Sequence, residues 1–165
     1  MIALQITELK QFMNTLLRTP VFDSFEVSEL RIDGMASYHI EGHLQKDFFS
    51  PEELEEKGLA GAEYLPYGLL RQNCFDLIKG SHVPLFFRFV LFCPKERSAE
   101  LLAEASLTEN DVSALCLILT YSRGKLSAAT GVSYRGFVLS HELDSLWDRE
   151  VKLFFEANKI SYDIV

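Results

Sequence analysis

The chain has 165 residues, a formal net charge of −8 and an apolar fraction of 48%. This length suits one domain, so we expect residues 1–165 to form a single globular unit. The negative charge argues against a general role in binding nucleic acid or an anionic membrane surface. The sequence has no signal-peptide pattern and no apolar run near the roughly 18 residues of a membrane span. We therefore expect an acidic, cytoplasmic protein.

Residues 1–83 predict a short strand at 1–6, a helix at 9–17, a hairpin at 25–44, a short helix at 51–57 and a longer helix from about 66 to 79. The hairpin turns after Asp33. Its apolar residues alternate in one phase at Phe25 and Val27 and in the opposite phase at Leu30 and Ile32, so we expect a bulge near Ser28. Ser50 starts the short helix with a capping box, and Gly80 is the expected stop of the longer one.

Residues 84–93, Pro-Leu-Phe-Phe-Arg-Phe-Val-Leu-Phe-Cys, form an almost wholly apolar run that predicts the central strand of a sheet. A strand covered on both faces has such a composition. Arg88 is its one charge, and we expect it to be at least partly buried and paired with a carboxylate, because a buried unpaired guanidinium is very costly. Loss of one member of a buried pair costs roughly 3–5 kcal/mol. If an anionic ligand is the partner, Arg88→Met leaves the empty protein at least as stable.

The remaining residues predict a helix at 96–105, strands at 112–121, 126–131 and 134–139, a helix at 140–158 and a closing strand at 160–164. Most strands are joined by turns, and the helices interrupt them without strict alternation. This order is typical of an α+β fold with a largely antiparallel sheet and about five helices packed on it. A doubly wound α/β fold is the alternative.

Three cysteines, Cys74, Cys93 and Cys116, are widely spaced in apolar segments, without a Cys-x-x-Cys pair. They predict buried free thiols in a reducing compartment. His39, Glu41 and His43 share one face of the hairpin's return strand, as metal ligands would. At about 3.3 Å per residue the two histidines lie roughly 13 Å apart, too far for one zinc ion. We predict no metal, no cofactor and no catalytic residues.

Thr130, Ser133 and Arg135 lie in a short segment whose hydroxyls, turn amides and guanidinium suit a phosphate or carboxylate. Together with Arg88 they form a candidate site for a small anion, provided that the fold brings all four into one pocket. A plain turn with surface hydroxyls explains the same segment.

Three segments carry a family resemblance: residues 1–17 with Ile-Ala-Leu-x-Ile, residues 77–91 with Leu-Ile-Lys-Gly and Val-Pro-Leu-x-Phe, and residues 130–147 with Thr-Gly-x-Ser, Phe137 and Trp147. In these the chain resembles an uncharacterised bacterial family of unknown function. The resemblance implies a compact, single-domain cytoplasmic protein and no particular chemistry.

Two functional hypotheses remain. The first is a non-enzymatic cytoplasmic domain that mediates protein–protein or self association, which requires an exposed apolar patch. The second is a small-molecule or anion-binding protein, with or without enzymatic activity, whose site lies near Arg88 and Arg135.

Overall fold

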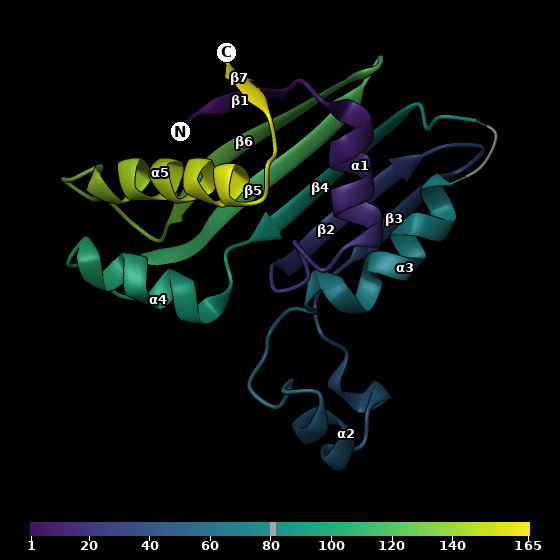
Figure 1. Ribbon diagram of the computed structural model, residues 1–165. Helices are drawn as coiled ribbons and strands as arrows, with labels where there is room; N and C mark the ends of the chain where they lie inside the picture. The colour runs from purple at the N-terminus through teal and green to yellow at the C-terminus, as the bar shows by residue number, and fades with distance from the viewer. Residues whose placement is uncertain (80–81) are drawn as a thin grey trace.

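A computed structural model describes residues 1–79 and 82–165 of the chain (Figure 1). Its elements, in chain order, are β1 (Ala3–Ile6), α1 (Leu9–Arg18), β2 (Glu26–Asp33), β3 (Ser37–Glu41), a 3-10 turn (Lys46–Phe48), α2 (Pro51–Glu56), α3 (Tyr67–Ile78), β4 (Phe86–Phe92), α4 (Lys95–Glu104), β5 (Val112–Ser122), β6 (Lys125–Tyr134), α5 (Glu142–Ala157) and β7 (Tyr162–Ile164). Gly80, the expected stop of α3, lies outside the described residues.

The seven strands form one sheet in the order β3-β2-β4-β5-β6-β1-β7, and every neighbouring pair is antiparallel. The α+β prediction is confirmed, and the doubly wound alternative is wrong. The run predicted as the central strand is β4. The middle position belongs to β5, which has three strands on either side.

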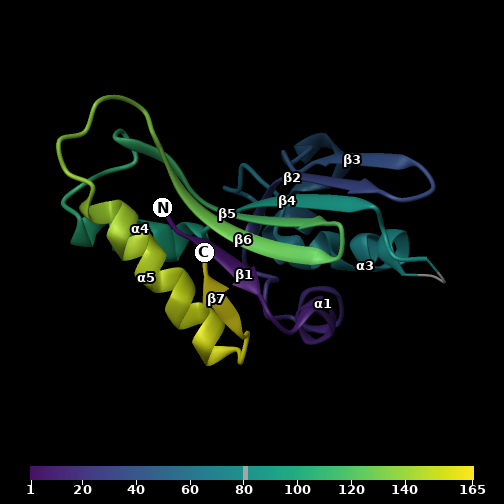
Figure 2. The same ribbon diagram turned by 90° about the horizontal axis from the view of Figure 1, so that it is seen from above.

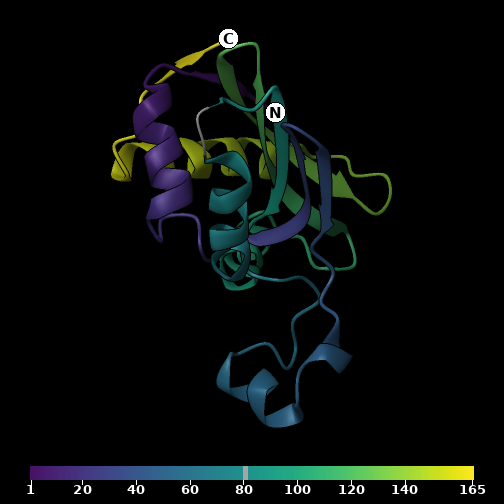
Figure 3. The same ribbon diagram turned by 90° about the vertical axis from the view of Figure 1, so that its right-hand side faces the viewer.

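Helices cover one face of this sheet. On β4, Phe87, Phe89 and Leu91 are fully buried beneath them. Figures 2 and 3 show α1, α3, α4 and α5 on this side, whereas α2 lies apart from the sheet in the excursion between β3 and α3. The described residues thus form the five predicted helices, of which α1, α3, α4 and α5 pack on the sheet. None of the described helices combines the length and the apolar composition that crossing a bilayer requires.

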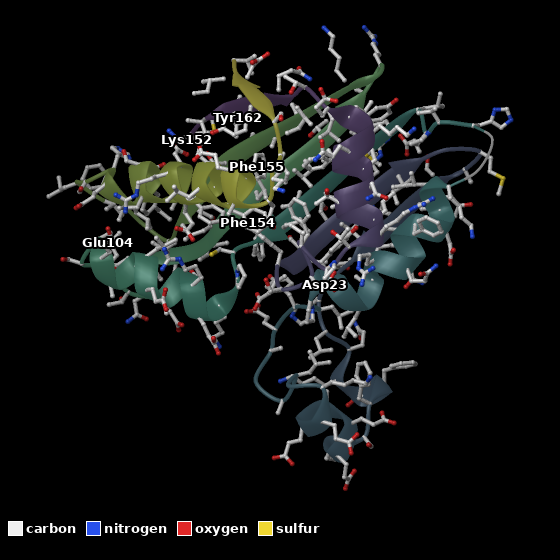
Figure 4. The ribbon with its side chains drawn as sticks, viewed as in Figure 1. Asp23, Glu104, Lys152, Phe154, Phe155 and Tyr162 are labelled. Carbon is white, nitrogen blue, oxygen red and sulfur yellow. The ribbon has the colours of Figure 1, made fainter. Side chains whose placement is uncertain are left out.

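Aromatic rings connect α5 to α1 and to the loop after α1. The ring of Phe12 lies 6.3 Å from that of Phe155, and the ring of Phe22 lies 5.3 Å from that of Phe154, both edge-on. Figure 4 shows Phe154 and Phe155 at the end of α5 that lies nearest α1. Edge-on pairs contribute about 0.5–1.5 kcal/mol beyond their buried area, so the rings help to fix the position of α5.

The expected bulge is present in the β2–β3 hairpin. The register with β4 shifts between Val27 and Glu29, which leaves Ser28 as the extra residue. The shift places Val27 and Leu30 together on the buried face. A Cβ at Gly42 would lie 1.9 Å from the carbonyl oxygen of Val27, so only glycine fits beside the bulge.

The predicted strand at 134–139 is wrong. β6 ends at Tyr134, and the loop that follows exposes 91% of Phe137 and of Leu139. The physical reason is the lack of a partner: Tyr134 pairs with Val112, the first residue of β5, so no further strand residue remains opposite the loop.

Both ends of the chain lie in the sheet, as their alternation predicts. β1 pairs with β6 on one side and with β7 on the other. Ile160, which precedes β7, is 7% exposed, and the N–H of Val165 donates to the carbonyl of Ala3 at 3.1 Å. The last residues therefore add a buried side chain and ladder hydrogen bonds.

Deletion of residues 160–165 should lower Tm by about 5 °C or more in scanning calorimetry. The deletion removes Ile160 from the core, and about 1 kcal/mol shifts Tm by about 2–4 °C in a domain of this size. Asp163→Asn, which removes only an exposed charge of β7, is the control and should leave Tm unchanged. An unchanged Tm in the deletion would mean that β7 adds no stability.

Candidate functional site: the open face of the sheet

The side chains that point away from the helices make up what we call the open face of the sheet. On β4 they are Phe86, Arg88, Val90 and Phe92, all half-buried. The expectation that β4 is covered on both faces is wrong, because the described helices pack against the other face only (Figure 3). These side chains shield one another without a helix above them.

Paired residues of antiparallel strands share a face, so the register defines rows across the open face. Between β4 and β1, two neighbouring rows hold only apolar residues and glycine: Val90, Ile118, Ala129 and Ala3 in one, Phe92, Cys116 and Gly131 in the other. On β2 these rows continue into Glu29 and Glu26. The next row is polar: Arg88, Thr120, Ser127 and Gln5. A sheet with one face in water normally presents polar side chains there, and the two apolar rows depart from that rule.

Side-chain size divides the open face along β5. On one side, the four β4 side chains named above are all large, and we call them the β4 ridge. On the other side, the middle of β6 presents Ser127, Ala129 and Gly131, which we call the β6 trough. Lys125 and Ser133 lie on the same face at its two ends. A Cβ at Gly131 would meet nothing nearer than the Cβ of Cys116, at 4.0 Å, so space remains above the trough.

Arg88 is paired with a carboxylate and partly buried, as predicted. Its Nη1 lies 3.3 Å from Oε1 of Glu29, and the two side chains are 43% and 42% exposed. Nε2 of His39 lies 3.6 Å from the other Glu29 oxygen. Nearby, the guanidinium of Arg31 lies 5.3 Å from the centre of the Phe86 ring. Charged side chains of β2 and β3 thus form a polar margin beside the β4 ridge.

Arg88 and Thr130, two members of the predicted anion site, lie on opposite faces of the sheet. Thr130 is on the buried face and is 1% exposed. Its hydroxyl accepts a hydrogen bond from the N–H of Ile2 at 2.9 Å and donates one to the carboxylate of Asp148. The hydroxyl of Thr130 therefore has both of its hydrogen-bond partners inside the protein, and it does not face a ligand shared with Arg88.

Ser133 and Arg135 lie near the end of β6. The hydroxyl of Ser113 donates to the Ser133 hydroxyl at 2.8 Å, and Nε of Arg135 donates to the carbonyl of Glu109 at 2.8 Å. Arg135 also borders a cavity at this end of the sheet. The four predicted residues therefore do not form one site, and Arg135 is the member that a ligand could reach from a cavity.

The histidines of β3 and the segment after it, His39 and His43, line one pocket of the open face but have different nearest partners. His39 is directed toward Glu29, and the ring of His43 lies edge-on to Tyr64 at 5.6 Å. Across residues 1–79 and 82–165, no three His, Cys, Asp or Glu side chains are grouped as metal ligands. That the protein binds no metal stays a prediction.

The three cysteines are free, and they differ in position. Cys74 and Cys93 are buried, and burial raises the pKa of each thiol to about 12. Cys116 lies half-buried on the open face, where burial also raises its pKa. The prediction of buried free thiols is therefore confirmed for two of them, whereas Cys116 belongs to the candidate surface.

Comparison with known proteins gives one match. The model of a family of unknown function (DUF5721) matches residues 15–163. No curated protein and no solved structure matches the chain. The match covers most of the sequence and brings no activity with it.

Arg88→Met should change the free energy of unfolding by less than about 1 kcal/mol in urea denaturation, because an exposed ion pair contributes little. This value replaces the roughly 3–5 kcal/mol expected of a buried pair. Glu29→Gln removes the other partner and should have a similarly small effect. A loss of about 3 kcal/mol or more in Arg88→Met would contradict the half-exposed geometry.

Proposed function

The chain belongs to the family of unknown function DUF5721, and we propose that it is a non-enzymatic, cytoplasmic domain that self-associates, two copies packing through their open faces. The observation that carries this proposal is the division of the open face into the β4 ridge and the β6 trough. Free cysteines, two of them buried, support a reducing compartment.

A two-fold axis makes the open face self-complementary. The axis runs parallel to β5, midway between two sheets packed about 10 Å apart. Because β5 is the fourth of seven strands, this rotation places β4 of one copy over β6 of its partner. The same surface patch then serves both copies, as in an isologous dimer.

In the rows of Arg88, Val90 and Phe92, the β4 side chain then faces a small side chain of β6, whereas Phe86 faces Lys125 of the partner subunit. Rotation about an axis parallel to β5 leaves each residue at the same position along the strand direction. Residues of one row in one copy therefore face residues of the same row in the other copy. Phe92 faces Gly131 of the partner subunit, and Val90 faces Ala129 of the partner subunit. Interdigitation of large and small residues is how packed interiors reach their density.

The charges of the open face do not oppose this arrangement. Glu29 and Arg31 lie on β2, which the rotation places over β1 of the partner, and β1 presents the uncharged Ala3 and Gln5 to the same face. Like charges therefore do not meet across these strands. The net charge of −8 per copy still repels the two copies at long range, and salt screens this repulsion.

Cys116 supports a binding role over a catalytic one for this surface. Its thiol is the one sulfur on the apolar rows, and burial raises its pKa. A thiol with a raised pKa is mostly protonated at neutral pH and is a poor nucleophile. Cys116 therefore offers contact area and lacks the lowered pKa of a catalytic thiol, although an added thiol reagent can still label it slowly.

Substitution in the β6 trough tests the proposal by sedimentation equilibrium. The wild type should reach twice the chain mass as its concentration rises, and more readily at higher salt. Ala129→Arg fills the trough and places like charges near the interface, so it should weaken the dimer at least tenfold, about 1.4 kcal/mol. Ala157→Arg, an exposed alanine on α5, is the matched control and should leave the mass distribution unchanged.

Two results would overturn the proposal. One is a wild type that stays at the chain mass up to its highest soluble concentration and in high salt. The other is a dimer that Ala129→Arg leaves intact, which would place the interface elsewhere. Circular dichroism of both variants checks that they fold.

A further inference from the structure

A cavity of about 170 Å³ lies at the end of the sheet where β4 leads into α4. The start of β2, the segment before α3, the first residues of β5 with the loop before them, and the segment after β6 complete its lining. Its lining combines apolar side chains, among them the half-buried Phe92 and the buried Leu102, with charged ones. These segments are far apart in the sequence and meet only in the fold.

Five charged residues line this cavity: Glu26, Glu63, Lys95, Glu109 and Arg135. In the part of the chain that the structure describes, none of the five forms an ion pair within 4.0 Å. Both signs are present around one small space, yet the charges stay apart. A ligand that enters this space meets unpaired groups of both signs.

Glu26 is the innermost of the acidic residues and is half-buried. Burial raises its pKa, the charge of Glu63 raises it further, and the charge of Lys95 opposes both effects. The charges of Lys95 and Glu63 therefore both act on the Glu26 carboxylate, although neither residue forms an ion pair with it. Holding its carboxylate there costs free energy that a bound ammonium group would recover.

Lys95 and Arg135 supply the positive side. The hydrogen bond from Nε of Arg135 to the carbonyl of Glu109 holds the guanidinium at the rim and leaves its Nη atoms for other partners. Lys95 is the first residue of α4, whose preceding residue, Pro94, provides no side-chain cap. Both cations line the cavity, so a carboxylate that enters it can approach either of them.

We propose that this cavity binds a small zwitterion, an amino-acid-like molecule whose ammonium group lies at Glu26 and Glu63 and whose carboxylate lies at Lys95 and Arg135. The size of the cavity supports this class, since drug-sized ligands occupy roughly 300–1,000 Å³. The proposal retains Arg135 from the predicted anion site and replaces its other members. The charged residues of the cavity lie outside the apolar rows between β4 and β1 of the proposed dimer, although Phe92 belongs to both surfaces.

A series of ω-amino acids of increasing length measures the spacing of the two poles. Glycine, β-alanine, 4-aminobutyrate and 6-aminohexanoate are titrated into the wild type by calorimetry, with thermal shift as a second readout. Butyrate and butylamine each carry one pole and serve as ligand controls. At least one zwitterion should bind, and at least tenfold more tightly than either single-pole compound.

Charge-neutral variants then identify the two poles. Glu26→Gln and Lys95→Met should each weaken the best zwitterion at least tenfold. Glu104→Gln and Lys152→Met, at residues labelled in Figure 4 that do not line the cavity, are the matched controls and should bind it unchanged. Ala129→Arg should also bind it unchanged, so a failed dimer and a failed ligand site are told apart.

The stability of Glu26→Gln separates loss of binding from loss of folding. The folded state raises the Glu26 pKa above its usual value of 4.5, so the wild type loses stability as pH rises through the raised pKa. Glutamine avoids this cost. The variant should therefore have a higher Tm than the wild type at pH 7, and the difference should vanish below pH 4.5.

Three outcomes would overturn the zwitterion site: no member of the series binds, butyrate binds as tightly as the best zwitterion, or Glu26→Gln binds that zwitterion with unchanged affinity. The second outcome would reduce the cavity to a site for simple anions.

Discussion

Burial of one face of the sheet, and one face only, is the constraint on which the rest of the structure depends. Four helices pack on the face that carries Phe87, Phe89 and Leu91, and they bind to it through aromatic and aliphatic contacts. The other face of the sheet carries two rows that are apolar between β4 and β1, and no described helix packs above them. A partly apolar, uncovered face therefore follows directly from how the core is built.

Local patterns in the sequence predicted the elements well. The bulge at Ser28, the capping box at Ser50 and the period-two alternation at both chain ends each depend on near neighbours, and all three are present. The carboxylate partner of Arg88 was also predictable, because the cost of an unpaired guanidinium does not depend on the fold. The small contribution of the Arg88–Glu29 pair to stability was not predictable from the sequence. It depends on how exposed the pair is, and that depends on which face of the sheet the helices cover.

Features that depend on strand order were not predictable from single segments. The anion site failed because Thr130 and Arg88 lie on opposite faces, and facing is set by the register of β5 with β4 and β6. The alternating small residues Ser127, Ala129 and Gly131 were visible in the sequence. That they form a trough beside the large residues of β4 could be inferred only once β6 was known to lie across β5 from Phe92. The charged cavity likewise joins segments from five parts of the chain.

Reactivity of the Cys116 thiol tests the central claim most directly, because this side chain lies on β5 beside the proposed two-fold axis. Cys74 and Cys93 are buried with pKa values raised to about 12, so a maleimide at pH 7 reports mainly on Cys116. If open faces pack together, the labelling rate of Cys116 falls as protein concentration rises and stays constant in Ala129→Arg. A wild-type rate that is independent of concentration, in a sample that sedimentation shows to be dimeric, would contradict burial of the open face.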